Sequence, residues 1–162
     1  MNGNGTLDLQ SGLTGEEIQA CLNVIREGGA VNLAVVKMRL PEAVLVALKR
    51  DGQEIVAVGA IKQKRPKYAA AIAKKCGFAF ETNTHELGYV AVKGTHRGKK
   101  LSHHIAAALL AQFRDRPIFA TTSNPYMKIT LTKLGFIQRG NEWKGNDGNP
   151  LSLWMKDAEL PI

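Results

Sequence analysis

The sequence predicts a mixed α/β fold in which one mixed sheet carries helices on both faces. Short segments rich in β-branched residues alternate along the chain with longer segments whose apolar residues recur at helical spacing. Two of the β-branched segments flank "DGQ" at residues 51–53, which is typical of a β-hairpin turn. The 162 residues have the length of one domain and show no repeat or internal boundary, so a single domain over 1–162 is predicted.

The N-terminal part is predicted to form a short strand over residues 6–9 and then a helix over 13–29. Thr14 can cap this helix and Glu17 completes a capping box, while the glycine pair at 28–29 ends it. The buried stripe of the helix is expected at Ile18, Cys21, Leu22 and Ile25.

A second helix is predicted over residues 33–40, because Pro41 cannot continue it. Strands over 43–50 and 54–62 form the two arms of the hairpin. The remaining elements are expected as strands over 86–92, 118–122, 136–143 and 151–156, and helices over 101–114 and 124–136.

Composition narrows the classes of partner. The net charge is +8, which favours anionic partners such as nucleotides, nucleic acid or acidic protein surfaces. Cys21 and Cys76 stand in no CxxC pattern, so buried thiols are expected rather than a disulfide framework or a zinc ribbon. The first ten residues do not resemble a signal peptide and the apolar runs are too short to span a bilayer, so we predict a cytoplasmic protein with no membrane partner.

The segment 62–78, "KQKRPKYAAAIAKKCGF", is rich in cations and contains no acid. Pro66 can start a helix in this segment and Gly77 can end it. One interpretation is a solvated basic helix, and the other is a patch that binds an anionic partner such as RNA. The cations are Lys62, Lys64, Arg65, Lys67, Lys74 and Lys75.

The stretch "VAVKGTHRGKKLS", residues 90–102, places two glycines and several cations where a predicted strand becomes a helix. It does not match a P-loop, because three residues rather than four separate Gly94 from Gly98 and Lys100 stands where Ser or Thr is required. The glycine fingerprint of dinucleotide-binding folds is also absent. Free amides at a helix start, helped by the helix dipole, bind a pyrophosphate well, whereas the alternative is a surface turn with a basic rim.

A second motif, "NPYMKITLTKLGF", follows in the next strand–helix unit. Together the two stretches resemble the GNAT superfamily of N-acetyltransferases. The first family signature, R/Q-x-x-G-x-G/A, corresponds to residues 97–102, after a V-x-P-x-x-R-G-like run over 92–98. The second, N-x-x-A-x-x-x-Y-x-K-x-G-F, corresponds to Asn124, Met127, Leu131, Lys133, Gly135 and Phe136. The resemblance covers residues 43–156 and includes the order of the elements.

The resemblance implies a GNAT-like fold, with a mostly antiparallel sheet and a splayed central strand pair. It also implies acetyl-CoA as cosubstrate and direct attack of a primary amine on the thioester. The pyrophosphate would be held by the backbone amides of Arg97, Gly98, Lys99, Lys100, Leu101 and Ser102. The pantetheine would bond to the strand edge formed by Val90, Ala91 and Val92, and Asn124 would touch the CoA arm near its thiol.

Glu86 is the candidate general base, because family members often carry a glutamate here that acts through water. Strand alternation would place it on the same face as Val90 and Val92. The alternative interpretation is an exposed carboxylate at a strand end. His85 is a second candidate base, although alternation points it to the other side.

Three histidines, His96, His103 and His104, raise the question of a metal. His103 and His104 are neighbours on a predicted helix, so their side chains diverge by about 100°. No carboxylate lies close to them in the sequence, and no metal site is therefore predicted.

Three positions depart from the family pattern. Lys100 and Ser102 stand where the family usually has Gly or Ala, so the Lys100 side chain must point away from the cofactor or toward a phosphate. Leu131 stands where the family commonly has the tyrosine that serves as general acid. Tyr126 lies about 140° round the helix from Leu131 and is no obvious replacement. Thr132 and Ser123 are weaker candidate donors, and water is a further one.

Three functions are compatible with the sequence. The first is transfer of acetyl to an amine of a protein or metabolite, and the second is transfer to an aminoacyl-tRNA or another amine carried by a nucleic acid. The third is a non-enzymatic CoA-binding or regulatory module whose basic patch binds nucleic acid. The sequence identifies neither the acceptor nor the choice between monomer and homodimer.

Overall fold

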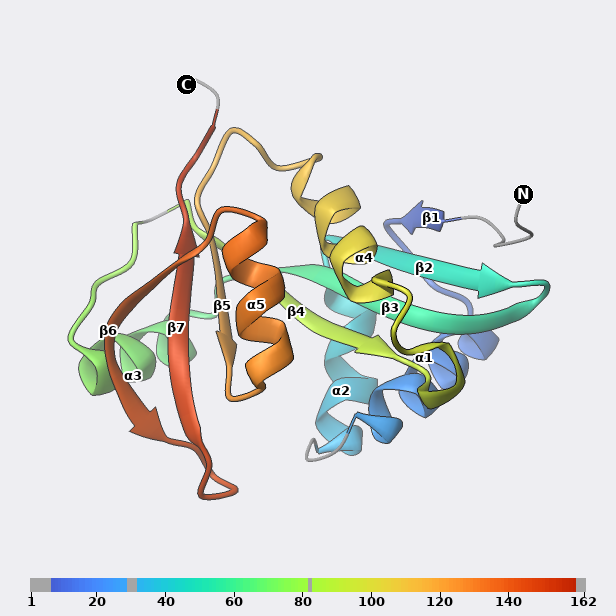
Figure 1. Ribbon diagram of the computed structural model, residues 1–162, viewed down its shortest axis with the longest axis horizontal. Coiled ribbons are helices and arrows are strands. Elements are labelled where there is room, and N and C mark those ends of the chain that lie inside the picture. Colours follow the sequence, from blue (N-terminus) through green and yellow to red (C-terminus); the bar gives the residue numbers. More distant parts are fainter. Residues whose placement is uncertain (1–6, 29–31, 82, 160–162) are drawn as a thin grey trace. The chain divides into compact units, whose positions relative to one another are not determined.

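The computed structural model describes residues 7–28, 32–81 and 83–159, and Figure 1 labels its helices and strands. The helices are α1 (Gly15–Glu27), α2 (Leu33–Arg39), α3 (Pro66–Cys76), α4 (Leu101–Leu110) and α5 (Pro125–Lys133), with short 3₁₀ turns η1 (Leu40–Glu42) and η2 (Gly94–His96). The strands are β1 (Leu7–Gln10), β2 (Leu45–Asp51), β3 (Glu54–Gln63), β4 (His85–Val92), β5 (Ile118–Thr122), β6 (Ile137–Lys144) and β7 (Pro150–Lys156).

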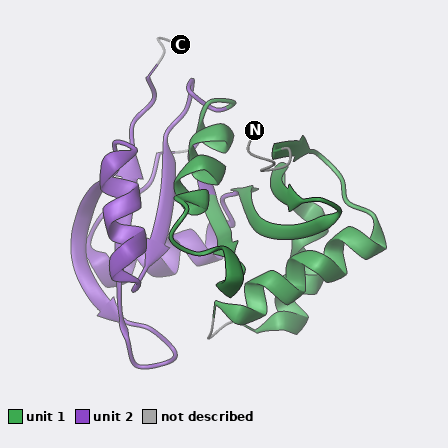
Figure 2. Ribbon diagram, turned by 45° about the vertical axis from the view of Figure 1, so that its right-hand side comes forward, with its two compact units in different colours: residues 1–62, 87–112 green, residues 63–86, 113–162 purple. Residues whose placement is uncertain are grey.

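The chain is divided into two compact units (Figure 2). The first unit comprises residues 1–62 and 87–112, and the second comprises 63–86 and 113–162. Hydrogen bonds link the strands in the order β1-β2-β3-β4 in the first unit and β4-β5-β7-β6 in the second. The seven strands are mostly antiparallel and the described residues form five α-helices, which confirms the predicted fold class.

The first unit packs helices on both faces of its strands. On one face, α1 and α2 share a buried apolar cluster with β2 and β3, including Cys21, Leu22, Ile25, Val36, Val46, Leu48 and Val58. On the other face, α4 approaches β3 at Gly59, where an added Cβ would lie 2.4 Å from Ile105 and 3.2 Å from Leu109. Glycine at this position therefore lets α4 pack directly on the strand.

Helix α1 begins at the predicted capping box. Thr14 Oγ1 accepts the backbone N–H of Glu17 at 3.1 Å, and the Glu17 carboxylate accepts the N–H of Thr14 at 2.8 Å. Ile18 is half-buried rather than buried. The buried residues are Cys21, Leu22, Val24 and Ile25. Gly28 ends the helix, whereas Gly29 lies outside the described residues.

The second unit is built on the antiparallel strands β5, β7 and β6, with β7 in the middle. Figure 1 shows α5 in front of β5. Helix α3 packs on these strands through a cluster that contains Ile72, Cys76, Phe119, Leu153 and Met155. Strand β6 passes the end of α3 at Gly140, where an added Cβ would lie only 2.4 Å from the Cys76 carbonyl oxygen.

Strand β4 has an irregular backbone that the sequence does not predict. It pairs in parallel with β5 at two register positions, His85 with Ile118 and Glu86 with Phe119. Farther along, Tyr89 has a φ of 55°, in the left-handed region that bulky residues rarely adopt. The regular alternation expected along β4 is therefore interrupted at this residue.

Most predicted boundaries lie within a few residues of those observed. Pro66 starts α3 and Gly77 ends it, as predicted, and the structure places Gly77 in the left-handed conformation. The predicted helix over 101–114 stops at Leu110, because the Gln112 N–H bonds to Leu109 and tightens the last turn. Cys21 and Cys76 are buried free thiols, and burial raises the pKa of Cys21 to about 12. Among the described helices, none is long and apolar enough to cross a bilayer.

Candidate functional site

Two residues of the loop between β4 and α4 have backbone conformations in the left-handed region. After the 3₁₀ turn η2, Gly98 adopts a φ of 83° and Lys100 a φ of 61°. An added Cβ at Gly98 would meet no atom within 4 Å, so the backbone there faces open space. Lys100 is the N-cap residue of α4, and the turn that it makes directs the chain into the helix.

A run of backbone amides is left without an acceptor at the start of α4. Within the described chain, the N–H groups from Gly98 to His103 donate to no protein atom. No side chain of the described residues caps α4 and its first turn contains no acid, whereas α1 and α5 are capped by the Thr14 and Asn124 side chains. Unpaired amides and the positive end of a helix dipole form an anion-binding site.

The cations of this loop fall into two groups. The guanidinium of Arg97 donates to the Glu27 carbonyl at 3.2 Å, so this side chain fastens the loop to the end of α1. The Arg97 backbone N–H is also engaged, by the Gly94 carbonyl at 3.5 Å. Lys99 and Lys100 are exposed and, among the described residues, form no hydrogen bond or ion pair. Two cations therefore remain beside the open amides.

Three acids from distant parts of the first unit brace this loop. The Glu27 carboxylate accepts the Gly94 N–H at 2.9 Å, and Glu54 pairs with Lys93 at the end of β4. The third acid is Asp51, whose Oδ2 lies 2.8 Å from His96 Nε2. The His96 Nδ1 also lies 2.8 Å from Thr95 Oγ1, and the Lys93 N–H donates to the Val56 carbonyl. The hydrogen bond from His96 holds the pKa of Asp51 below its ordinary value.

The β4 residues predicted to line the CoA arm lie in the first unit, in the same unit as the loop. Val90, Ala91 and Val92 are all half-buried. Ala91 packs with the cluster of α1 and α2, and Val90 lies within 3.4 Å of the Cβ position of Gly59, on the side of α4. Two neighbouring side chains therefore point to opposite faces beyond Tyr89, and the backbone between them forms the strand edge.

The second unit holds Glu86 and His85 at the start of β4. Glu86 is 4% exposed, so it is a buried carboxylate rather than the exposed strand-end acid that was the alternative interpretation. His85 stacks on Phe113 with ring centroids 5.9 Å apart, and its Nδ1 lies 3.2 Å from the Asn83 carbonyl. Burial lowers the pKa of His85.

Asn124 is the N-cap residue of α5 and Leu131 lies within this helix, also in the second unit. The Asn124 side-chain oxygen caps the helix by accepting the N–H groups of Tyr126 at 2.8 Å and Met127 at 3.3 Å. Only its amide NH₂ is left to donate elsewhere. Leu131 is 0% exposed and Tyr126 is 80% exposed, so no phenol on this helix replaces the tyrosine expected at 131.

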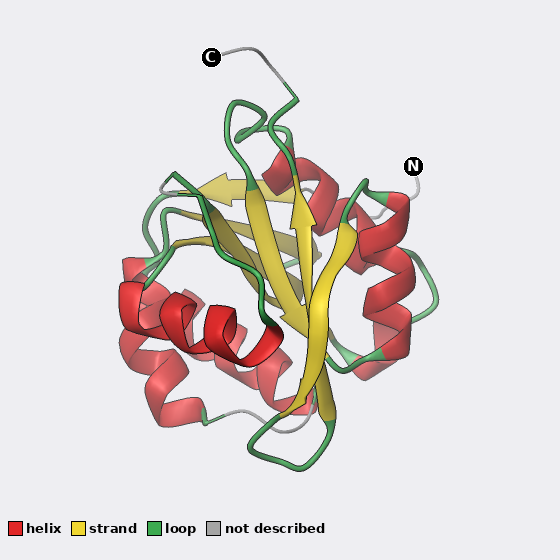
Figure 3. Ribbon diagram, turned by 90° about the vertical axis from the view of Figure 1, so that its left-hand side faces the viewer, coloured by secondary structure: helices red, strands yellow, loops and turns green. Residues whose placement is uncertain are grey.

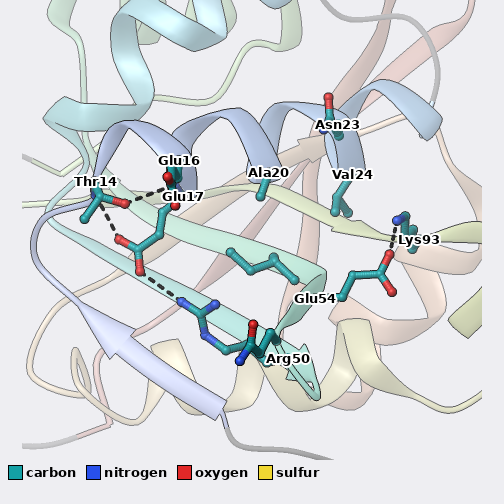
Figure 4. Close-up of a pocket in the computed structure, with 11 residues that line it drawn as sticks. Thr14, Glu16, Glu17, Ala20, Asn23, Val24, Arg50, Glu54 and Lys93 are labelled. Carbon is teal, nitrogen blue, oxygen red and sulfur yellow. Dashed lines mark hydrogen bonds and ion pairs between the residues drawn. The ribbon is translucent and has the colours of Figure 1, made fainter.

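A cavity of about 440 Å³ lies in the first unit between α1 and the β2–β3 hairpin, shown in Figure 4. Its charged lining residues pair mainly with one another: Glu17 with Arg50 at 2.9 Å, and Glu54 with Lys93. None of the predicted cofactor-binding residues lines it. Lys93, at the start of the β4–α4 loop, is one of the residues that line the cavity. The amides of residues 98–103 do not line it.

The three histidines do not form a metal site. The rings of His103 and His104 lie 6.1 Å apart at 76°, and His96 is engaged with Asp51. Within the described ranges, no group of three or more His, Cys, Asp or Glu residues could hold a metal ion.

Comparisons with solved structures bear on the fold of the chain. No protein-family model and no curated protein sequence matches the chain. Solved structures do match. A histone acetyltransferase HPA2-related acetyltransferase from Corynebacterium glutamicum has a TM-score of 0.75 at 18% identity, over 98% of this chain and 99% of that one.

Two other structures extend the comparison. A GNAT-family acetyltransferase from Streptococcus agalactiae has a TM-score of 0.73 at 15% identity, covering 97% of this chain and 98% of that one. A chain of the NatC complex bound to Gag peptide and CoA has a TM-score of 0.67 at 10% identity, covering 93% and 98%. The chain described here has the fold of the GNAT acetyltransferases.

Proposed function

We propose that this protein transfers the acetyl group of acetyl-CoA to a primary amine. The observation that carries the proposal is the run of backbone amides from Gly98 to His103 at the start of α4, which donate to no atom of the described chain and include those of the exposed Lys99 and Lys100. This arrangement fits a pyrophosphate, which accepts several N–H groups and favours nearby cations. The presence of CoA in one structure of the same fold supports the same ligand.

With the pyrophosphate bound at the start of α4, the pantetheine arm of CoA would run along β4. The backbone edge at Val90, Ala91 and Val92 would bond the pantetheine amides, as one extended chain bonds another. Asn124 would donate its amide NH₂ to the CoA arm, because its oxygen already caps α5. In this proposal the cradle runs over 98–103 rather than the 97–102 expected from the sequence, because the Arg97 amide donates to Gly94 and the His103 amide has no acceptor in the described chain.

Starting from the protonated amine, the reaction removes two protons from the nitrogen, one before and one after its attack, and supplies one proton to the leaving thiolate. The amine nitrogen attacks the thioester carbonyl carbon, the C–S bond breaks, and CoA leaves as a thiolate. Because an amine with a pKa near 10 is mostly protonated at neutral pH, a base speeds the attack, and Glu86 acting through water is our candidate. A backbone N–H near Val92 would stabilise the oxyanion. Water would protonate the thiolate, because Leu131 is apolar and buried.

Thermal stabilisation tests the ligand. Acetyl-CoA at 100 times its Kd should add about 2.7 kcal/mol to the free energy of unfolding. Gly98→Val should weaken this binding about tenfold or more, because a β-branched residue is strained at positive φ and crowds the site. Gly148→Val is the matched control, since Gly148 has a φ of 85° and also faces open space. A melt that responds to ATP but not to acetyl-CoA would contradict the proposal.

Turnover with labelled acetyl-CoA tests the reaction and the acceptor. The acceptor panel should include peptides with free N-termini, small amines and bulk tRNA, which covers the acceptor classes compatible with the sequence. Labelled acetyl amide with any of them supports the enzyme. Tight acetyl-CoA binding without transfer to any acceptor would favour a non-enzymatic CoA-binding module, which the apolar Leu131 makes the second candidate.

A further inference from the structure

Helix α3 carries a basic face that the proposed acetyl transfer does not use. The helix buries Ala69, Ile72 and Cys76 against the strands of the second unit. Its opposite face consists of five exposed residues: Lys67, Ala70, Ala71, Lys74 and Lys75. Among the described residues, the three lysines form no hydrogen bond or ion pair. Figure 3 is viewed from the side on which α3 lies in Figure 1 and shows the helix toward the viewer.

Further cations lie at both ends of the helix. Arg65 directly precedes α3 and is exposed, with its guanidinium 4.7 Å from the centre of the Tyr68 ring. At the other end, β6 touches α3 at Gly140, and the guanidinium of the preceding residue, Arg139, lies 5.9 Å from the Phe78 ring. We define the α3 surface as Arg65, Lys67, Lys74, Lys75 and Arg139.

We propose that the α3 surface binds the phosphate backbone of a nucleic acid. The first argument is charge complementarity. The sequence from residue 62 to residue 80 contains no acid, so nothing within this segment neutralises the lysines. Lys67 and Lys74 are two helical turns apart, about 10 Å along the axis, which exceeds the spacing of successive phosphates along a strand. One helix face can therefore contact more than one phosphate.

The second argument separates a nucleic acid from an acidic protein. Protein interfaces are depleted in lysine and depend on aromatic or large apolar anchors. The exposed residues between the lysines of α3 are alanines, which offer no such anchor. Contacts with a phosphate backbone require only Lys and Arg, and small alanines let the backbone approach the helix closely. Binding should therefore be strong at low salt and independent of base sequence.

Fluorescence anisotropy with the full chain tests this proposal. The probes are labelled single-stranded RNA, duplex RNA and duplex DNA of equal length, and a poly-glutamate peptide of equal charge, from 50 to 200 mM NaCl. We expect the nucleic acids to bind, with an affinity that falls steeply as salt rises. Comparison among the three identifies the preferred form. Equal or tighter binding of poly-glutamate would overturn the proposal in favour of an acidic protein partner.

A pair of variants with the same change in net charge localises the binding. Lys67→Ala/Lys74→Ala should weaken nucleic-acid binding about tenfold at 100 mM salt and reduce the salt slope by about 2, one for each phosphate contact. Lys37→Ala/Lys144→Ala removes two exposed lysines elsewhere and should change binding little. Equal losses in both variants, with both folded by circular dichroism, would overturn the α3 assignment.

The acetyl-CoA melt separates this proposal from the proposed reaction. The α3 variant should keep its full stabilisation by acetyl-CoA, because none of the α3 residues belongs to the β4–α4 loop. Loss of nucleic-acid binding with intact acetyl-CoA binding supports the proposal. Absence of nucleic-acid binding by the native chain at 50 mM salt would refute it, whatever the result with acetyl-CoA.

Discussion

The Glu27 carboxylate accepts the backbone N–H of Gly94 at 2.9 Å and thereby joins the end of α1 to the loop before α4. An acid in the last turn of a helix is disfavoured by the helix dipole. At this site the cost is offset by the bond to Gly94, and the neighbouring Glu27 carbonyl, which the helix leaves unpaired, receives the Arg97 guanidinium. One residue of α1 therefore fixes two points of the loop whose amides we assign to CoA.

Glu27→Ala should loosen the loop without removing any amide from it. A single hydrogen bond contributes about 1 kcal/mol, so acetyl-CoA affinity should fall about fivefold. Glu27→Gln keeps an oxygen that can accept the Gly94 N–H and should restore most of the affinity. Titration calorimetry of the three proteins checks this. Equal affinity of the Ala variant and the native protein would show that Glu27 does not position the loop.

Lys100→Gly should stabilise the free protein. A non-glycine residue in the left-handed region destabilises the folded protein by about 1–2 kcal/mol. Glycine removes this cost, but its greater conformational freedom in the unfolded chain cancels about 0.4–1 kcal/mol of the gain. The net gain lies between about 0 and about 1.6 kcal/mol, and each kcal/mol corresponds to a rise in Tm of about 2–4 °C. Lys100→Ala loses the same charge but keeps the strained backbone, so it should show no gain. Equal melting temperatures for the two variants would contradict the explanation.

The acid stability of the protein should depend on Asp51. The hydrogen bond from His96 lowers the pKa of Asp51 in the folded protein, so its contribution is present above the unfolded pKa and is lost as pH falls through the folded pKa. Asp51→Asn should therefore lose less stability than the native protein between about pH 5 and about pH 3. Urea melts across this range measure it. Asp157→Asn, at an exposed position, is the control and should follow the native curve.

Leu131→Tyr restores the tyrosine of the family pattern but should not restore an acid. Leu131 is 0% exposed, so the larger phenol would overpack the core and lower stability by about 1–3 kcal/mol. Leu131→Ala should cost about 2–5 kcal/mol, as expected for a buried leucine. Thr132→Ala, at the exposed neighbour, should stay within about 0.5 kcal/mol of the native protein. A faster and equally stable Leu131→Tyr enzyme would show that the site has room for the phenol.

Local signals in the sequence were sufficient for the elements and for several of their ends. The capping box of Thr14 and Glu17, and the Pro66 start and Gly77 end of α3, depend on residues a few positions apart. These are short-range interactions, and their residue types have few alternative roles. The order of the elements then determined the fold class.

The brace around the β4–α4 loop could not be predicted in the same way. Glu27, Asp51 and Glu54 lie 67, 45 and 39 positions from their partners, and nothing in a single sequence marks such pairs. The left-handed Tyr89 is equally hidden, because a bulky residue gives no local reason to expect it. Asn124 has a second reason to be asparagine, since its oxygen caps α5. A motif residue can thus serve the helix start as well as a ligand.

Glu86→Gln tests the proposed base. Glu86 is 4% exposed and lies opposite Phe119 in the short parallel pairing of β4 with β5. Glutamine keeps the shape of the side chain and removes its charge, so kcat/KM should fall about 10²-fold while acetyl-CoA affinity stays unchanged. The acidic limb of the pH profile should flatten, because its titrating group is gone. Glu81→Gln, at an exposed residue of the same unit, should leave rate and profile unchanged. If Glu86→Gln kept full activity from about pH 6 to about pH 9, the base would have to be another group, and His85 would be the next to replace.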